Sequence, residues 1–70
     1  MQIKVKVKKS EWKQEVEPFG NNMYLAYVIS DSEKSILEEL THLLSRKLGV
    51  PPARIQLVSK NGSDMIFNLS

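Results

Sequence analysis

Hydrophobic and polar positions alternate strictly near the start of the chain, where residues 3–9 read IKVKVKK. A period of two is typical of a strand with one buried face and one solvated face. The stretch predicts a strand over about residues 2–8. Its apolar residues are Ile3, Val5 and Val7, and its lysines on the opposite face are Lys4, Lys6 and Lys8.

A second strand is predicted at residues 23–29, MYLAYVI, which are apolar at nearly every position. Such a run is typical of a central strand with both faces partly covered. We expect Met23, Leu25, Tyr27 and Ile29 to face the core, and Tyr24, Ala26 and Val28 to lie on the other face. Residues 9–22 are predicted as a polar loop, with a short strand at 14–17 as an alternative. Its apolar residues Trp12, Val16 and Phe19 are expected to pack onto the core.

One amphipathic helix follows. Ser30 and Glu33 have the spacing of a capping box, and Ser32 is a second N-cap candidate. Apolar residues then recur at helical spacing: Ile36, Leu37, Leu40, Leu43, Leu44 and Leu48. Gly49 suits the position after the helix end, and Pro51 stops the helix.

The last two predicted strands, about residues 55–59 and 64–69, form a hairpin. A two-residue turn at Asn61-Gly62 would divide the apolar residues between both faces. A three-residue loop of Lys60, Asn61 and Gly62, with Gly62 left-handed, keeps them together. It pairs Ser59 with Ser63, Leu57 with Met65, and Ile55 with Phe67. We therefore predict the three-residue loop.

These elements predict an α+β fold with the order ββαββ in two layers. One helix covers one face of a four-stranded, largely antiparallel sheet, and the lysines lie on the open face. Seventy residues allow a single domain, 1–70. No apolar run reaches the length of a membrane span. The absence of cysteine excludes disulfides and fits a cytoplasmic location.

The sequence offers no enzyme signature, so we expect a non-enzymatic binding module. Glu38, His42 and Ser45 share one helix face, but that face is opposite the leucines and is predicted to be solvated. One histidine and no cysteine exclude a structural zinc site. The glycines are scattered rather than clustered before a helix, so no phosphate loop is predicted. No catalytic residue, metal or cofactor is predicted.

The lysine face is the main candidate for binding. The net charge is only +2, but residues 4–13 hold five lysines and one acid. A sheet face with lysines and an aromatic ring is a platform for single-stranded nucleic acid, RNA in particular. The candidate residues are Lys4, Lys6, Lys8, Lys9 and Tyr24. Two alternatives stay open: a plain solvated face, and a surface for a protein partner or a second copy.

The lysine-rich first strand, NNMYLAYV, the leucine helix and LGVPPARIQLVS together resemble the YggU-like family of uncharacterised proteins. The resemblance implies a sheet order of 1-2-4-3, with the first strand at an edge. Lysines would there discourage aggregation. Two polar family motifs are altered: a Gly-Lys-Ala-Asn stretch is replaced by residues 34–37, and Asp64 stands where a base is expected. A weaker likeness to ubiquitin-like folds rests on MQI, EVEP and GVPPARIQL.

Overall fold

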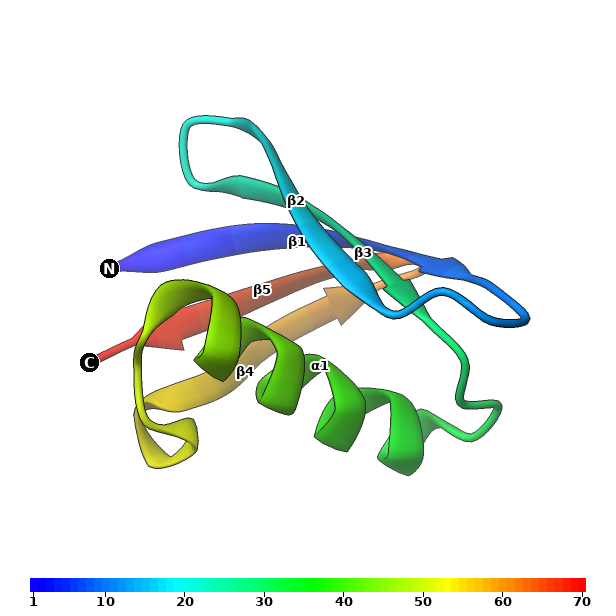
Figure 1. Ribbon diagram of the computed structural model, residues 1–70. Coiled ribbons are helices and arrows are strands. Elements are labelled where there is room, and N and C mark those ends of the chain that lie inside the picture. Colours follow the sequence, from blue (N-terminus) through cyan, green and yellow to red (C-terminus); the bar gives the residue numbers. More distant parts are fainter.

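Five strands and one α-helix follow one another along the chain, and the helix crosses one face of a single sheet (Figure 1). The computed structural model describes all residues from 1 to 70. The strands are β1 (Gln2–Lys9), β2 (Glu15–Gly20), β3 (Met23–Val28), β4 (Ile55–Asn61) and β5 (Asp64–Leu69). The helix α1 spans Glu33–Leu48, and a 3₁₀ turn at Pro52–Arg54 leads into β4.

The predicted four-stranded, largely antiparallel sheet with order 1-2-4-3 is wrong. The sheet has five strands in the order β2-β3-β1-β5-β4, and β1 pairs with β3 in parallel. Strand β1 therefore lies at the centre of the sheet. The lysines of β1 do not guard an edge, and the edges are formed by β2 and β4.

The extra strand comes from the segment expected to be mainly loop. Strand β2 alternates, with Val16 buried between the solvent-facing Glu15 and Glu17, and pairs antiparallel with β3. A tight turn at Asn21-Asn22 joins the two strands, and Asn22 adopts a positive φ of 56°. This hairpin returns β3 parallel to β1, and β1 is central because β3 pairs with one of its sides and β5 with the other. Pro18 is accommodated because β2 is an edge strand.

The two faces of β3 are the reverse of the prediction. The parallel register places Tyr24 beside Val5 and Ala26 beside Val7, on the helix side. Ala26 and Val28 are almost fully buried there, in one cluster with Leu40 and Leu44 of α1. Each leucine of this kind contributes about 1.5–3 kcal/mol by burial. Tyr24 is partly buried against the same cluster.

Both helix ends are built by local signals. The Oγ of Ser32 accepts a hydrogen bond from the Ser35 amide at 3.2 Å, so Ser32 is the N-cap and the alternative start at Ser30 is wrong. Gly49 closes the helix in the left-handed conformation, with φ of 70°, as predicted. Its amide donates to the Ser45 carbonyl.

The β4–β5 hairpin uses neither of the two turns considered. Its turn residues are Gly62 and Ser63, and Asn61 pairs with Asp64. Gly62 is left-handed as predicted, with φ of 64°. A bulge between Leu57 and Ser59 then shifts the register. The bulge keeps the apolar residues before it on the helix side, which a sequence argument based on a regular ladder cannot foresee.

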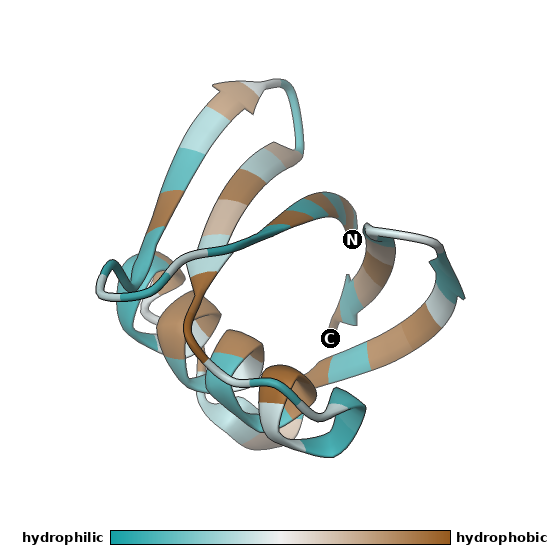
Figure 2. Ribbon diagram, turned by 90° about the vertical axis from the view of Figure 1, so that its right-hand side faces the viewer, coloured by the Kyte–Doolittle hydropathy of each residue, from teal (hydrophilic) through white to brown (hydrophobic).

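Residues 9–22, which were predicted to tuck their apolar side chains onto the core, do so only in part. Val16 is buried, but Trp12 is 84% exposed and Phe19 is 50% exposed. The ribbon of β1 alternates between apolar and polar residues (Figure 2), and Ile3 and Val5 of β1 are buried. No helix of this protein is long and apolar enough to cross a membrane.

Candidate functional site

The face of the sheet away from α1 carries three columns of side chains from the three central strands. The register places β1 between β3 on one side and β5 on the other. We call these residues the open face: Lys4, Lys6 and Lys8 of β1; Met23, Leu25 and Tyr27 of β3; Asp64, Ile66 and Asn68 of β5. The β3 and β5 members are all partly buried, and the three lysines are exposed.

Two of the predicted nucleic-acid residues are not on this face. Tyr24 lies on the helix side, because it pairs with the buried Val5. Lys9 follows the alternation of β1 to the helix side and forms an ion pair with Asp31. Only Lys4, Lys6 and Lys8 are brought together as predicted. The aromatic ring of the open face is Tyr27, which the sequence argument had assigned to the core.

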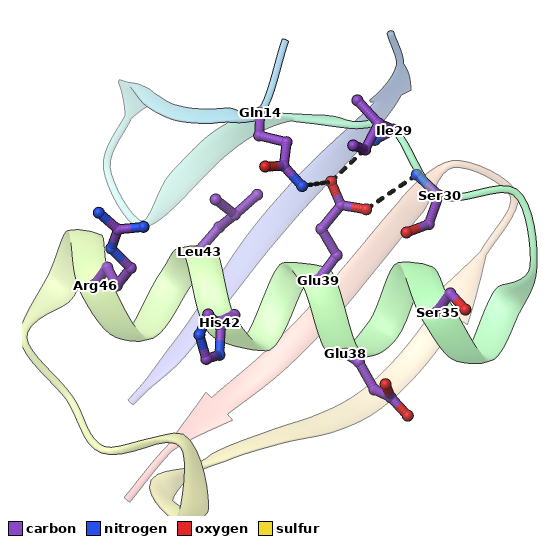
Figure 3. Close-up of a pocket in the computed structure, with 9 residues that line it drawn as sticks. All are labelled: Gln14, Ile29, Ser30, Ser35, Glu38, Glu39, His42, Leu43 and Arg46. Atoms are coloured by element: carbon purple, nitrogen blue, oxygen red, sulfur yellow. Dashed lines mark hydrogen bonds between the residues drawn. The ribbon is translucent and has the colours of Figure 1, made fainter. Parts of the chain in front are cut away.

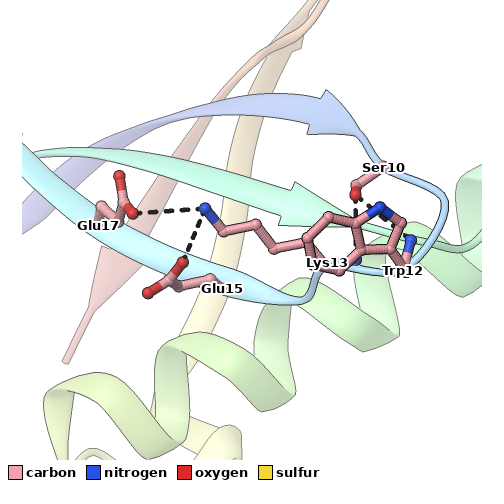
Figure 4. A network of polar contacts seen from close by, with 5 residues as sticks. All are labelled: Ser10, Trp12, Lys13, Glu15 and Glu17. Carbon is pink, nitrogen blue, oxygen red and sulfur yellow. Dashed lines mark hydrogen bonds and ion pairs between the residues drawn. The ribbon is translucent and has the colours of Figure 1, made fainter.

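The ring of Tyr27 is already occupied by a cation. The Nζ of Lys13, from the loop between β1 and β2, lies 4.4 Å from the ring centroid, a cation–π contact. The same ammonium is 3.1 Å from Glu15 and 3.8 Å from Glu17, both on β2 (Figure 4). Its hydrogen bond to Glu15 raises the pKa of Lys13 and lowers the pKa of Glu15. Lys13 thus covers one end of the open face.

The lysines of β1 differ in their partners. Lys4 lies 3.8 Å from the carboxylate of Asp64, while Lys6 and Lys8 form no ion pair. On β3, Leu25 lies beside Lys6 and Tyr27 beside Lys8, while on β5 Ile66 lies beside Lys4 and Asp64 beside Lys6. The open face therefore carries a short positive row between partly apolar columns, with the carboxylate of Asp64 within it.

A second polar cluster lies on the opposite side of the molecule and holds the connection between β3 and α1. The carboxylate of Glu39 accepts hydrogen bonds from the amides of Ile29 at 2.9 Å and Ser30 at 3.0 Å (Figure 3). It also accepts one from the side-chain amide of Gln14 at 2.7 Å. Partial burial alone would raise the pKa of Glu39, but these hydrogen bonds outweigh it and the pKa lies below the usual value.

This cluster is structural. All three donors point at the carboxylate of Glu39, which therefore fixes two loops to the helix. The hydrogen bonds of the cluster do not join a basic group to a nucleophile. Neighbouring Glu38 and His42 line the same open hollow of about 460 Å³ without forming an ion pair. The sequence argument did not identify Glu39, since a glutamate on a helix carries no signal that distant amides converge on it.

No group of three or more potential metal-ligating side chains exists in the protein. Comparison with protein-family models, with curated proteins and with solved structures found no match to this chain. The resemblance to the YggU-like family therefore stays a prediction, and the functional argument rests on the geometry of the open face.

Proposed function

We propose that this protein is a non-enzymatic binding domain whose open face binds a partner protein. The observation that carries the proposal is the pairing of unneutralised charge with apolar surface. Lys6 and Lys8 form no ion pair, and the half-buried Leu25 and Tyr27 of β3 lie beside them. Exposed apolar side chains next to charged groups are typical of surfaces that bind other proteins. The partner is expected to present apolar side chains with acidic residues placed opposite Lys6 and Lys8.

Features of the open face favour a protein over nucleic acid. Single-strand binding platforms stack bases on exposed aromatic rings, but Lys13 lies over Tyr27 and would have to move away. Asp64 on the open face and Glu15 and Glu17 beside it would repel phosphates. The positive row is also short, because only Lys6 and Lys8 are free of ion pairs.

A pull-down from native-cell lysate tests the proposal. Tagged wild-type protein is compared with the double variant Lys6→Glu/Lys8→Glu. The matched control is Arg46→Glu/Lys47→Glu, which has the same change in net charge on exposed positions of α1 away from both proposed sites. Each sample is split and treated with or without nuclease.

We expect at least one protein that is retained by the wild type and by the helix control, lost with Lys6→Glu/Lys8→Glu, and insensitive to nuclease. Release of all bound material by nuclease would instead favour the nucleic-acid alternative. Its signature would be an affinity that falls with salt at a slope of about −2 in log units for two phosphate contacts. Equal retention by both double variants would contradict the proposal.

A further inference from the structure

Strand β4 is an edge strand whose outward backbone groups have no partner in the sheet. The carbonyl of Arg54 accepts a hydrogen bond from the Ser70 amide at 3.1 Å. Because antiparallel pairs alternate, Gln56 also turns its backbone groups toward β5, whereas Ile55 and Leu57 turn theirs outward. Leu57 therefore presents a free amide and carbonyl to an added strand, and Ile55 presents its carbonyl, because the Ile55 amide already donates to the Pro52 carbonyl.

A groove of about 390 Å³ runs beside this edge on the helix side. It exists because α1 packs closest to β2, β3 and the 3₁₀ turn, which leaves the β4 side of the sheet less covered. The exposed fraction of Leu57 is 38%. The groove is lined by Glu33, Lys34, Leu37, Leu57, Lys60 and Met65.

The bulge of β4 brings a cation to the groove. Lys60 pairs with Met65, whose side chain is buried on the helix side. Without the extra residue at Val58, Lys60 would lie on the open face instead. Lys60 now reaches across the groove and forms an ion pair with Glu33 at the first turn of α1.

The charges around the edge favour an acidic occupant. From Arg54 to Asn61 the chain carries two cations and no acid, and Lys34 adds a third on the helix wall. A second copy paired antiparallel about Leu57 would bring the Arg54 and Lys60 cations of both chains to one edge with no acid between them, so like charges oppose self-pairing. Glu33 is the only carboxylate that lines the groove, and Lys60 already neutralises it.

We propose that the β4 edge and the groove between β4 and α1 bind an extended peptide with aliphatic residues at its centre and acidic residues at its flanks. The peptide adds to the sheet as a sixth strand through the amide and carbonyl of Leu57 and the carbonyl of Ile55, as in other cases of strand addition. Alternate side chains enter the groove against Leu37, Leu57 and Met65. Its flanking carboxylates reach Lys34 and Lys60. This site is separate from the open face and does not depend on it.

Binding of synthetic peptides, followed by amide shifts in NMR spectra of the ¹⁵N-labelled protein, tests the inference. The probe is a pool of short peptides with Val, Ile or Leu at four central positions and Asp or Glu at both ends. One control pool has Lys at the ends, and another has Pro at a central position, which removes a backbone donor. We expect saturable shifts on β4 and the first half of α1 with the acidic pool only.

Two substitutions sharpen the test. Lys60→Glu is expected to weaken binding about tenfold, since it reverses a contact charge, while Lys47→Glu changes it less than twofold. Glu33→Gln is expected to strengthen binding, because it releases Lys60 from its internal ion pair. Thermal melting of each variant checks that the fold is retained.

Three results would overturn the inference. One is the absence of β4 shifts at about 1 mM peptide, the weak end of specific binding. Another is equal binding of the proline pool. The last is β4 shifts that grow with protein concentration alone, which would assign the edge to a second copy. None of these results bears on the open face, whose partner is tested by Lys6 and Lys8.

Discussion

Removing the carboxylate of Glu39 is expected to destabilise the protein more than any other change to an exposed or half-exposed charge. Glu39→Ala deletes three hydrogen bonds, from Gln14, Ile29 and Ser30. Hydrogen bonds to charged groups contribute about 1.5–3 kcal/mol each when buried. Here the freed donors can bond to water, and alanine recovers a few tenths of a kcal/mol in helix propensity. We expect a net loss of about 2 kcal/mol.

Thermal and urea unfolding measure this loss. For a domain of this size, about 2 kcal/mol corresponds to a fall in Tm of roughly 8–16 °C. The matched control is Glu38→Ala, one position away on the same helix, whose carboxylate makes no hydrogen bond or ion pair. Its effect should stay within about 0.5 kcal/mol. Equal melting temperatures for the two variants would refute the structural role of Glu39.

The same carboxylate predicts a pH dependence. Its pKa in the folded protein lies below the ordinary value of 4.5, so the unfolded chain binds its proton more readily than the folded one. The stabilisation is therefore complete above about pH 4.5 and is lost as the pH falls through the folded pKa. The stability gap between wild type and Glu39→Gln should be widest at neutral pH and shrink in acid. A gap that widens in acid would contradict this sign.

Other substitutions test the faces and ends of the elements. Leu25→Lys should be tolerated on the open face, whereas Ala26→Lys buries an unpaired charge and should cost more than about 3 kcal/mol in urea unfolding; equal effects would mean that β3 faces the other way. Gly49→Ala should cost about 1–2 kcal/mol, because a Cβ has free space there and only the positive φ opposes it. Ser32→Ala should cost about 1 kcal/mol through loss of the N-cap, measured against Ser35→Ala, whose hydroxyl caps nothing.

Local signals in the sequence predicted the elements well. The strict alternation of residues 3–9 predicted β1 and its buried face, and Gly49 predicted the helix end. These features depend only on residues that are close together in the sequence, because alternation within a strand and the ending of a helix at glycine act over a few residues. Gly62 belongs to the same group, since its left-handed conformation is needed by any tight turn at that place.

The order of the strands in the sheet could not be predicted from such local signals. It depends on whether the stretch from Glu15 to Gly20 forms a strand, and Pro18 within it argues against one. The alternation around Val16 and the pair Asn21-Asn22 were the available signals for a hairpin. With β2 present, β3 runs parallel to β1, and the long-range pairing of β5 with the other side of β1 makes β1 central. The order of the sheet thus depends on one short strand and one long-range pairing.

For the same reason, the sequence predicted the lysines of the candidate site but not the residues beside them. The lysine row follows from alternation within β1 and needs no knowledge of its neighbours. The companions of the row follow from the register of β3, and a shift of one residue exchanges its faces. Because β3 is apolar on both faces, its sequence did not distinguish Tyr24 from Tyr27. Only the pairing with β1 places Tyr27 beside the lysines.

The central claim, a protein partner on the open face, is tested most directly by a photo-crosslinking residue at position 25. p-Benzoylphenylalanine in place of Leu25 stands on the open face beside Lys6, while the same group at Lys47 of α1 is the control. After irradiation in native-cell lysate, we predict a discrete protein adduct at position 25 that resists nuclease, is displaced by unlabelled wild-type protein and is absent at position 47. Adducts that vanish with nuclease, or that are the same at both positions, would contradict the account.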